Sequence, residues 1–219
     1  MLNVLITGAN RGIGLELSRQ FSERGDQVIA VCRNSSPGLD ELHVGVISGI
    51  DVRDDSSVKS LAKKLSGRRI DILINNAGIL QSDSLDKLDF ESMKSQFDVN
   101  ALGPLRVSSA LLPNLKKGSK LIVITSRMGS IADNSSGAYY GYRMSKAALN
   151  MAAMNLARDL YKKSISVGIL HPGMVATKMT GGQGISPVES VRGLINRIEA
   201  LGLKKSGTFW HANGEELPW

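Results

Sequence analysis

Apolar residues fall into short runs that recur along the whole chain. Each run is rich in valine, isoleucine or leucine, and most do not alternate with polar positions. Strands of this kind are buried on both faces, which is typical of a parallel sheet. The sequence therefore predicts about seven strands, over Leu2–Ile6, Gln27–Cys32, Val44–Ile50, Ile70–Ile74, Lys120–Thr125, Ser164–Leu170 and Thr208–Trp210.

Between these runs lie segments whose apolar residues follow a helical period. In the first, Ile13, Leu17 and Phe21 form one stripe. The segments expected to be helical are Gly12–Arg24, Ser56–Leu65, Phe90–Leu115, Tyr139–Tyr161 and Pro187–Leu201. Because strands and helices alternate to the end, we expect a three-layer α/β fold, a doubly wound parallel sheet in a single domain over residues 1–219.

Two stretches are expected to be loops, Arg33–Leu42 and Thr177–Ser186. The second contains three glycines, at positions 181, 182 and 184, and predicts a flexible flap over about 177–187. A flap this short predicts an open pocket with loose selectivity.

The composition excludes several classes of protein. The 219 residues include 27 Lys and Arg against 20 Asp and Glu, a net charge of +7, and one cysteine, Cys32. A single cysteine excludes an intramolecular disulfide and a Cys-based zinc cluster, and we expect no metal site. No apolar run approaches the ~18 residues of a membrane span, and the N-terminus lacks the basic start of a signal peptide, so we expect a cytoplasmic protein. The basic residues are not gathered on one element, which argues against nucleic-acid binding.

A glycine-rich turn follows the first predicted strand and opens the first predicted helix. It reads TGANRGIG over residues 7–14. Glycines let the backbone approach a pyrophosphate, and the N–H groups at the helix start can bind it. A plain strand–helix turn is the alternative, and the spacing GxxxGxG departs from the common GxGxxG, but the position is the one a dinucleotide requires. The expected contacts are Gly8, Asn10, Arg11, Gly12, Ile13 and Gly14.

The end of the second predicted strand bears on the choice of cofactor. An NAD site usually carries an acidic residue about 20 residues past the glycine turn, for the ribose 2′-hydroxyl. Here Arg33 stands in that region and no acid occurs before Asp40. Arg33, together with Arg11, suits a 2′-phosphate, unless both are simply solvated surface groups. The sequence favours NADP(H) over NAD(H).

Tyr142 and Lys146 are four residues apart in the fourth predicted helix, so they share one face. A cation beside a phenol favours the phenolate, and we expect Lys146 to lower the pKa of Tyr142 from ~10. A tyrosine tuned in this way is a plausible general acid for a carbonyl oxygen. Such a pair alone is common on helix surfaces.

Together these features resemble the short-chain dehydrogenase/reductase family, whose fold is of the Rossmann type, and the resemblance covers essentially the whole chain. Residues 75–78 read NNAG, like the family motif after the fourth strand, and Ser126 in an S-x-x-G context matches the catalytic serine. Ser130, Ser135 and Ser136 are rival serines. Further matches are Asn100, the acid–apolar pair Asp51 and Val52, and a PG…T segment at Pro172, Gly173 and Thr177.

The resemblance implies hydride transfer between a nicotinamide and a carbonyl carbon, with a catalytic set of Asn100, Ser126, Tyr142 and Lys146. Tyr142 would exchange the proton, Lys146 would also bind the nicotinamide ribose, Ser126 would donate to the carbonyl oxygen, and Asn100 would hold a water. Asn100 is equally interpreted as a helix-kink residue that satisfies backbone groups. Further cofactor contacts are implied for Asp51, Val52, Asn76, Ala77, Gly78, Pro172, Gly173, Val175 and Thr177.

A longer spacing between Ser126 and Tyr142, with the extra residues in 131–137, and the short C-terminal half resemble the C-factor-like carbonyl reductases of the family. The function this implies is NADPH-dependent reduction of an aldehyde, ketone or quinone. The alternative is a signalling or regulatory protein that binds the cofactor with little turnover. The resemblance also implies a homodimer.

Overall fold

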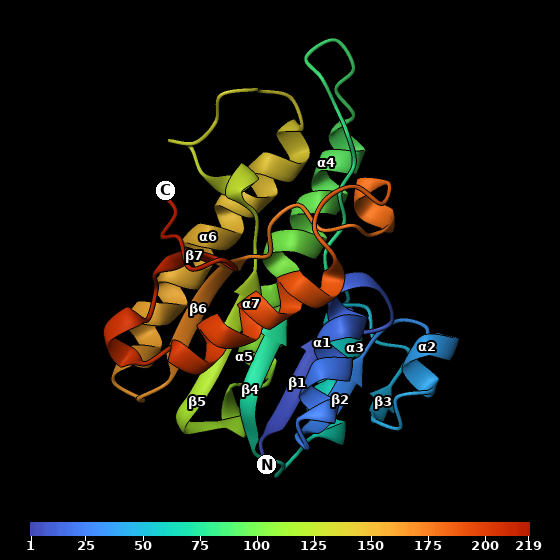
Figure 1. Cartoon of the computed structure of the whole chain (residues 1–219), viewed down its shortest axis with the longest axis vertical. Helices are drawn as coiled ribbons and strands as arrows, with labels where there is room; N and C mark the ends of the chain where they lie inside the picture. The colour runs from blue at the N-terminus through green and yellow to red at the C-terminus, as the bar shows by residue number, and fades with distance from the viewer.

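The computed structural model describes all residues, 1–219. Seven strands form one sheet, and every neighbouring pair is parallel. Figure 1 shows the sheet from one face, with the expected doubly wound arrangement confirmed. In spatial order β3-β2-β1-β4-β5-β6-β7, the strands are β1 (Asn3–Thr7), β2 (Gln27–Val31), β3 (Gly45–Ile47), β4 (Ile70–Asn75), β5 (Leu115–Ile124), β6 (Ser166–His171) and β7 (Phe209–His211).

Helices cover both faces of this sheet. One face carries α1 (Gly12–Glu23) and α7 (Pro187–Ala200), while the other carries α3 (Asp55–Lys64), α5 (Gly103–Ala110) and α6 (Tyr140–Tyr161). The helix α4 (Phe90–Phe97) lies beside α6 near the carboxyl end of the sheet, and the short α2 (Pro37–Asp40) follows β2 (Figure 1).

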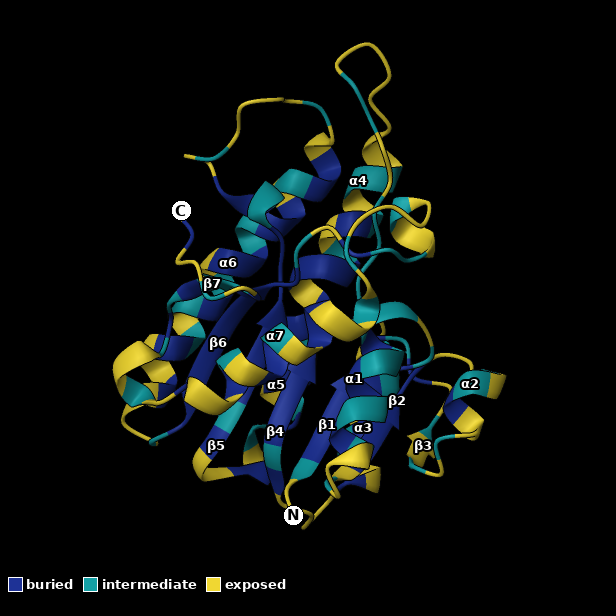
Figure 2. Cartoon of the chain, viewed as in Figure 1, coloured by how far each residue is buried: buried dark blue, intermediate teal, exposed yellow.

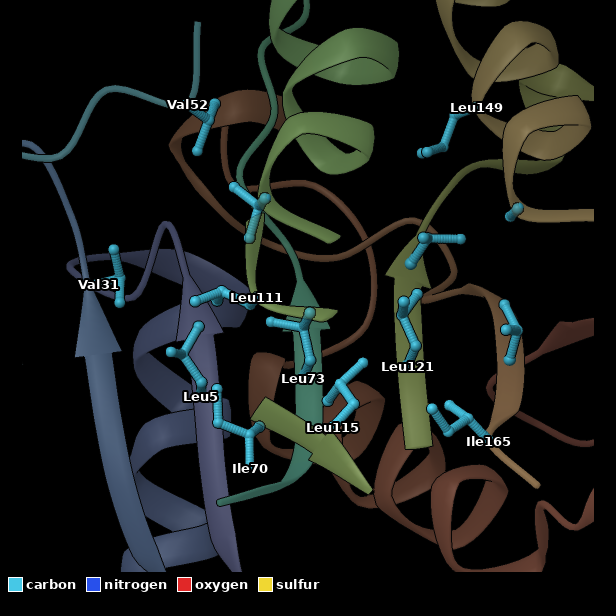
Figure 3. Packing of buried hydrophobic residues seen from close by; sticks show 14 of the residues in the cluster. Leu5, Val31, Val52, Ile70, Leu73, Leu111, Leu115, Leu121, Leu149 and Ile165 are labelled. Atoms are coloured by element: carbon cyan, nitrogen blue, oxygen red, sulfur yellow. The ribbon is translucent and has the colours of Figure 1, made fainter. Parts of the chain in front are cut away.

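Two apolar clusters, one on each face, hold the layers together. Successive strand residues point to opposite faces, so Leu5 joins the cluster under α5 and α6 and Ile6 joins the cluster under α1 and α7. Figure 2 shows the strands as an almost continuous buried layer, and Figure 3 shows Leu5, Leu73 and Leu121 of neighbouring strands among the side chains of one cluster. Full burial of one such side chain contributes about 1.5–3 kcal/mol, which fixes the register of the sheet.

The strand order reverses between β1 and β4, and this point locates the ligand crevice. From β1 the chain moves outward through β2 to β3, and then returns to β4 on the other side of β1. In open α/β sheets, ligands bind outside the carboxyl ends of the strands at such a reversal. The glycine turn after β1 and the segment after β4 both lie there.

The predicted long helix over Phe90–Leu115 is confirmed as far as Ala110, but it ends there rather than at Leu115 and contains an irregular turn. Helix α4 ends at Phe97, residues Asp98–Leu102 form a π-helical turn, and α5 follows. Pro104 has no amide hydrogen for the carbonyl of Asn100, so the regular ladder cannot continue there. The chain then enters β5 at Leu115, five residues before the predicted strand start at Lys120, because Leu115 pairs with Ile70 after a register shift.

Two further boundaries differ from prediction. The third strand covers Gly45–Ile47 rather than Val44–Ile50, since it is a short edge strand with two exposed residues. The expected loop Arg33–Leu42 contains the four-residue helix α2, which Ser36 caps through the N–H of Leu39.

Candidate active site

The glycine turn between β1 and α1 is too tightly packed for side chains at two positions. Gly8 has φ +65°, and a Cβ there would lie 2.8 Å from the Cα of Ala77. A Cβ on Gly14 would lie 2.2 Å from the carbonyl oxygen of Gly8. Gly12 also has a positive φ, +55°. The glycines therefore allow the turn to press against the segment that follows β4.

Thr7 and Asn76 fasten these two segments together. The Thr7 hydroxyl accepts hydrogen bonds from the backbone N–H groups of Asn76 (3.0 Å) and Ala77 (3.1 Å). In return, Asn76 Nδ2 donates to the carbonyls of Thr7 (3.0 Å) and Gly8 (3.2 Å). Asn76 and Ala77 were predicted as cofactor contacts, but Thr7 was not. A hydroxyl residue directly after three apolar strand residues was the available signal.

The start of α1 fits a phosphate group. Arg11 precedes the helix, but its side chain makes no capping hydrogen bond, and the first turn contains no acidic residue. Ile13 is half-buried in that turn. The first N–H groups of α1 therefore have no side-chain acceptor, and the positive end of the helix dipole favours an anion there.

The residues predicted to bind the cofactor near its ribose 2′-position lie around the ends of β2 and β3. Asn10 Nδ2 donates to the carbonyl of Asn34 at 2.9 Å, which ties the glycine turn to the loop that carries Arg33. Arg33 is exposed. A hydrogen bond and ion pair with Arg53 (2.7 Å) lower the pKa of Asp51, and the charge of Arg33 adds to this effect.

Val52 is buried next to Asp51 and contacts the start of α5. A Cβ on Gly103 would lie 2.9 Å from Cγ2 of Val52, so the two backbones approach closely. This contact connects Val52, one of the implied cofactor contacts, to the helix that follows the π-helical turn.

The segment Pro172–Thr177 leaves β6 and runs toward the glycine turn. Gly173 has φ +85°, and Val175 is buried and bridges to Ile185. A Cβ on Gly12 would lie 3.4 Å from Cγ2 of Thr177, so this segment lies against the predicted phosphate site. The structure thus places the two predicted cofactor segments side by side.

The predicted flap folds into a compact loop. Thr177 caps a 3-10 turn at Lys178–Thr180, and the backbones of Ala176 and Ile185 are joined by a hydrogen bond of 2.8 Å. Its glycines all have positive φ, and a Cβ on Gly184 would lie 2.0 Å from the carbonyl oxygen of Met174. The positive φ at each position therefore explains why the loop is rich in glycine, and its flexibility stays a prediction.

Ser126 lies just past the end of β5, buried, with its proton available. Its Oγ accepts a hydrogen bond from the N–H of Met128 at 3.1 Å, so the hydroxyl hydrogen is free to donate elsewhere. The next glycine explains the S-x-x-G context, because a Cβ on Gly129 would lie 2.7 Å from the backbone of Lys146. Ser126 is therefore held directly against α6.

Tyr142 and Lys146 are both buried in the first turns of α6. Burial raises the pKa of Tyr142 to about 12, and the hydroxyl of Ser126 partly opposes this shift. Burial lowers the pKa of Lys146 to about 8. The prediction that Lys146 lowers the pKa of Tyr142 is wrong for this arrangement. Its Nζ donates to the carbonyl of Ile124 at 3.0 Å and lies 5.7 Å from the centroid of the Tyr142 ring.

Asn100 lies in the π-helical turn, and its side chain binds both the N–H and the carbonyl of Ile79. Its Oδ1 accepts from the N–H of Ile79 (2.9 Å), and its Nδ2 donates to the carbonyl of Ile79 (2.8 Å) and to Ser145 Oγ (3.0 Å). The structural interpretation of Asn100 is thus borne out by its contacts. A Cβ on Gly78 would lie 3.3 Å from Asn100 Oδ1 and 3.7 Å from Lys146 Nζ, so Asn100 and Lys146 converge on Gly78.

The rival serines occupy other environments. Ser130 accepts from the N–H of Asp133, while Ser136 accepts from Arg143. Ser135 is exposed. Only Ser126 of these serines influences the pKa of Tyr142.

The chain belongs to the short-chain dehydrogenase family, since the model of that family matches residues 2–185. It is therefore an oxidoreductase of this family with a Rossmann-type fold.

Two curated relatives are similar over much of their length. The 1-hydroxy-2-glutathionyl-2-methyl-3-butene dehydrogenase of Rhodococcus is 41% identical over 226 residues, with both chains fully covered. The C-signal protein of Myxococcus xanthus is 43% identical over 166 residues, which cover 74% of this chain and 100% of that protein. The predicted likeness to C-factor-like proteins is confirmed.

Solved carbonyl reductases share the whole fold. The NADPH-bound enzyme from chicken fatty liver is 32% identical with a TM-score of 0.91, over 100% of this chain and 99% of that one. The Pseudomonas aeruginosa enzyme in complex with NADP is 35% identical with a TM-score of 0.86, over 100% of both chains.

Proposed function

We propose that the protein reduces a small-molecule carbonyl compound to an alcohol, with NADPH as hydride donor, in a reaction that is reversible in principle. The observation that carries this proposal is the buried pair of Ser126 and Tyr142 beside Lys146. The glycine turn and the Pro172–Thr177 segment lie at the same edge of the sheet. The solved relatives named carbonyl reductases support the substrate class.

The bound nicotinamide supplies the hydride, and the protein supplies position and a proton. Ser126 donates its free hydroxyl hydrogen to the carbonyl oxygen, where negative charge develops. One such donor can contribute ~3 kcal/mol to the transition state. Tyr142 then gives its phenolic proton to the same oxygen. Burial raises the pKa of Tyr142 to about 12, so its proton is in place at neutral pH, but this pKa lies above the near-neutral value that is best for a general acid.

NADP(H) is the proposed cofactor on the residues of the chain itself. Arg33 and Arg11 are exposed near the expected ribose position, and Asp51 is already paired with Arg53. A 2′-phosphate would therefore meet cations rather than a free carboxylate. The NADPH and NADP in solved relatives support this choice.

The test is NADPH oxidation with a panel of aldehydes, ketones and quinones, extended to a glutathione-conjugated aldehyde because of the Rhodococcus relative. Tyr142→Phe should lower kcat by about 100-fold or more, within the range of general acid catalysis. Tyr161→Phe is the matched control, since Tyr161 is an exposed tyrosine at the far end of the same helix. Equal rates for wild type and Tyr142→Phe would refute the assignment.

A second candidate is a signalling protein that binds the cofactor with little turnover, which the relative named C-signal supports. Tight NADPH binding without turnover on the whole panel would favour it.

Two further proposals concern assembly and location. We propose a homodimer, supported by the exposed apolar side chains of Phe97, Leu105 and Met151, and light scattering tests it. No helix of the structure is long and apolar enough to cross a membrane. A cytoplasmic location stays a prediction.

A further inference from the structure

The segment Ile79–Asp83, which leaves β4 and reaches the start of α6, is anchored at every second residue. Asn100 binds both backbone groups of Ile79. The buried Gln96 of α4 accepts from the N–H of Gln81 at 3.0 Å. Asp83 in turn contacts α6. The segment therefore links the π-helical turn to the helix that carries the candidate acid.

Helix α6 has no cap of its own. Tyr139, the residue before it, has φ +51° and makes no side-chain capping hydrogen bond, and the first turn contains no acidic residue. Ala138 also has a positive φ, +53°. Two successive non-glycine residues in the left-handed region are costly, so surrounding contacts must hold them in place.

Asp83 provides those contacts from 57 residues away. One carboxylate oxygen accepts from the N–H of Tyr140, and the other accepts from Gly141 at 3.0 Å. The backbone carbonyl of Asp83 accepts from the N–H of Tyr139 at 3.0 Å. One residue thus satisfies three successive N–H groups where α6 begins, and its charge lies at the favourable end of the helix dipole.

The position of Tyr142 depends on this helix start. Gly141, the residue before it, packs so closely on α4 that a Cβ would lie 2.7 Å from Gln96 Nε2. The carbonyl of Tyr142 accepts from Ser145 Oγ (2.8 Å), which itself accepts from Asn100. The backbone of Tyr142 is therefore held from Asp83 on one side and from Asn100 on the other.

We propose that Asp83 is a positioning residue for the reaction, a remote cap that sets the helix start from which Tyr142 reaches the carbonyl oxygen. The inference rests on the proposed function, because its consequence is a loss of proton transfer from Tyr142. Asp83 does not itself contact the reacting atoms in this role.

The experiment compares Asp83→Ala and Asp83→Asn with wild type in NADPH-dependent reduction of the best carbonyl substrate. Misplacement of Tyr142 should lower kcat of Asp83→Ala by about 10- to 100-fold. KM and the Kd of NADPH should stay within about twofold, because the nucleotide segments are untouched. Asp83→Asn keeps one acceptor oxygen and should recover part of kcat.

The matched control is Asp54→Ala, which removes a cap from α3, where Asp54 Oδ1 accepts from the N–H of Ser56 at 2.9 Å. It should leave kcat unchanged. Hydrogen exchange adds a readout without turnover: the amides of Tyr140 and Gly141 should exchange faster in Asp83→Ala. An active wild type with kcat unaffected by Asp83→Ala would overturn the positioning role alone. No turnover by wild type would instead refute the proposed function, and the positioning role of Asp83 with it.

Discussion

His171 provides the sharpest test of how burial controls charge in this protein. It ends β6, it is only 9% exposed, and its Nδ1 has no hydrogen-bond partner. Its ring packs edge to face with the ring of His211, and the two ring centroids are 4.9 Å apart. Burial lowers the pKa of His171 to about 3, and the charges of His211, Arg127 and Lys146 add to the effect.

The lowered pKa makes stability depend on acid. The unfolded chain takes up a proton at His171 below its ordinary pKa of 6.5, whereas the folded chain does so only near pH 3. Above pH 6.5 the ring is neutral in both states, so His171 does not change the free energy of unfolding. As the pH falls from 6.5 toward 3, the free energy of unfolding decreases progressively. At pH 5.0 the loss from this group is about 2 kcal/mol, at ~1.4 kcal/mol for each pH unit.

The assay is urea unfolding at pH 7.5 and pH 5.0 for wild type and His171→Leu. Wild type should lose about 2 kcal/mol more than the variant between the two pH values, since leucine cannot take up a proton in the unfolded state. The control is His43→Asn, because His43 is exposed and asparagine tolerates its left-handed φ of +51°. An equal loss in wild type and His171→Leu would refute the argument that burial excludes the proton.

Two other predictions concern the cofactor. Gly14→Ala should weaken NADPH binding by about tenfold or more, because its Cβ would lie 2.2 Å from the carbonyl oxygen of Gly8 and 2.5 Å from Asn76 Nδ2. Gly202→Ala is the control for glycine replacement, because a Cβ there meets no atom within 4 Å and its φ is not positive, and equal binding by Gly14→Ala and wild type would contradict the close packing. Arg33→Ala should raise the Kd of NADPH by about tenfold, the loss of one charged hydrogen bond, and leave the Kd of NADH unchanged. Fluorescence titration measures both constants, and equal losses for the two cofactors would speak against a 2′-phosphate contact.

Much of the fold follows from local pattern. The apolar runs around Leu5, Leu73 and Leu121 mark strands because successive residues are apolar, so that both faces of each strand are buried. The irregular turn inside the helix over Phe90–Ala110 could also have been predicted, since Pro104 cannot donate to the carbonyl of Asn100. The start of β5 at Leu115 could not, because it depends on a register shift against β4.

In the candidate site, too, some residues could be predicted from local sequence and others depend on long-range contacts. Gly8, Ser126, Tyr142 and Lys146 stand in short motifs whose chemistry is readable from residue type and spacing. Asp83 stands in no motif, and its role depends on contacts 57 residues away. The direction of the pKa shift of Tyr142 could not be predicted from sequence either. The spacing places a lysine nearby, but it does not show how deeply the phenol is buried.

The contacts of Asn100 narrow its predicted role in proton supply. Both hydrogens of its amide are donated, to the carbonyl of Ile79 and to Ser145 Oγ, so the side chain has none left for a water. Oδ1 accepts once, from Ile79, and an amide oxygen can accept twice. A water held between the Asn100 side chain and Lys146 would therefore donate to Oδ1, beside Gly78, and accept from the ammonium. The same side chain can thus fix the segment after β4 and take part in proton supply, because the two roles use different lone pairs of one oxygen.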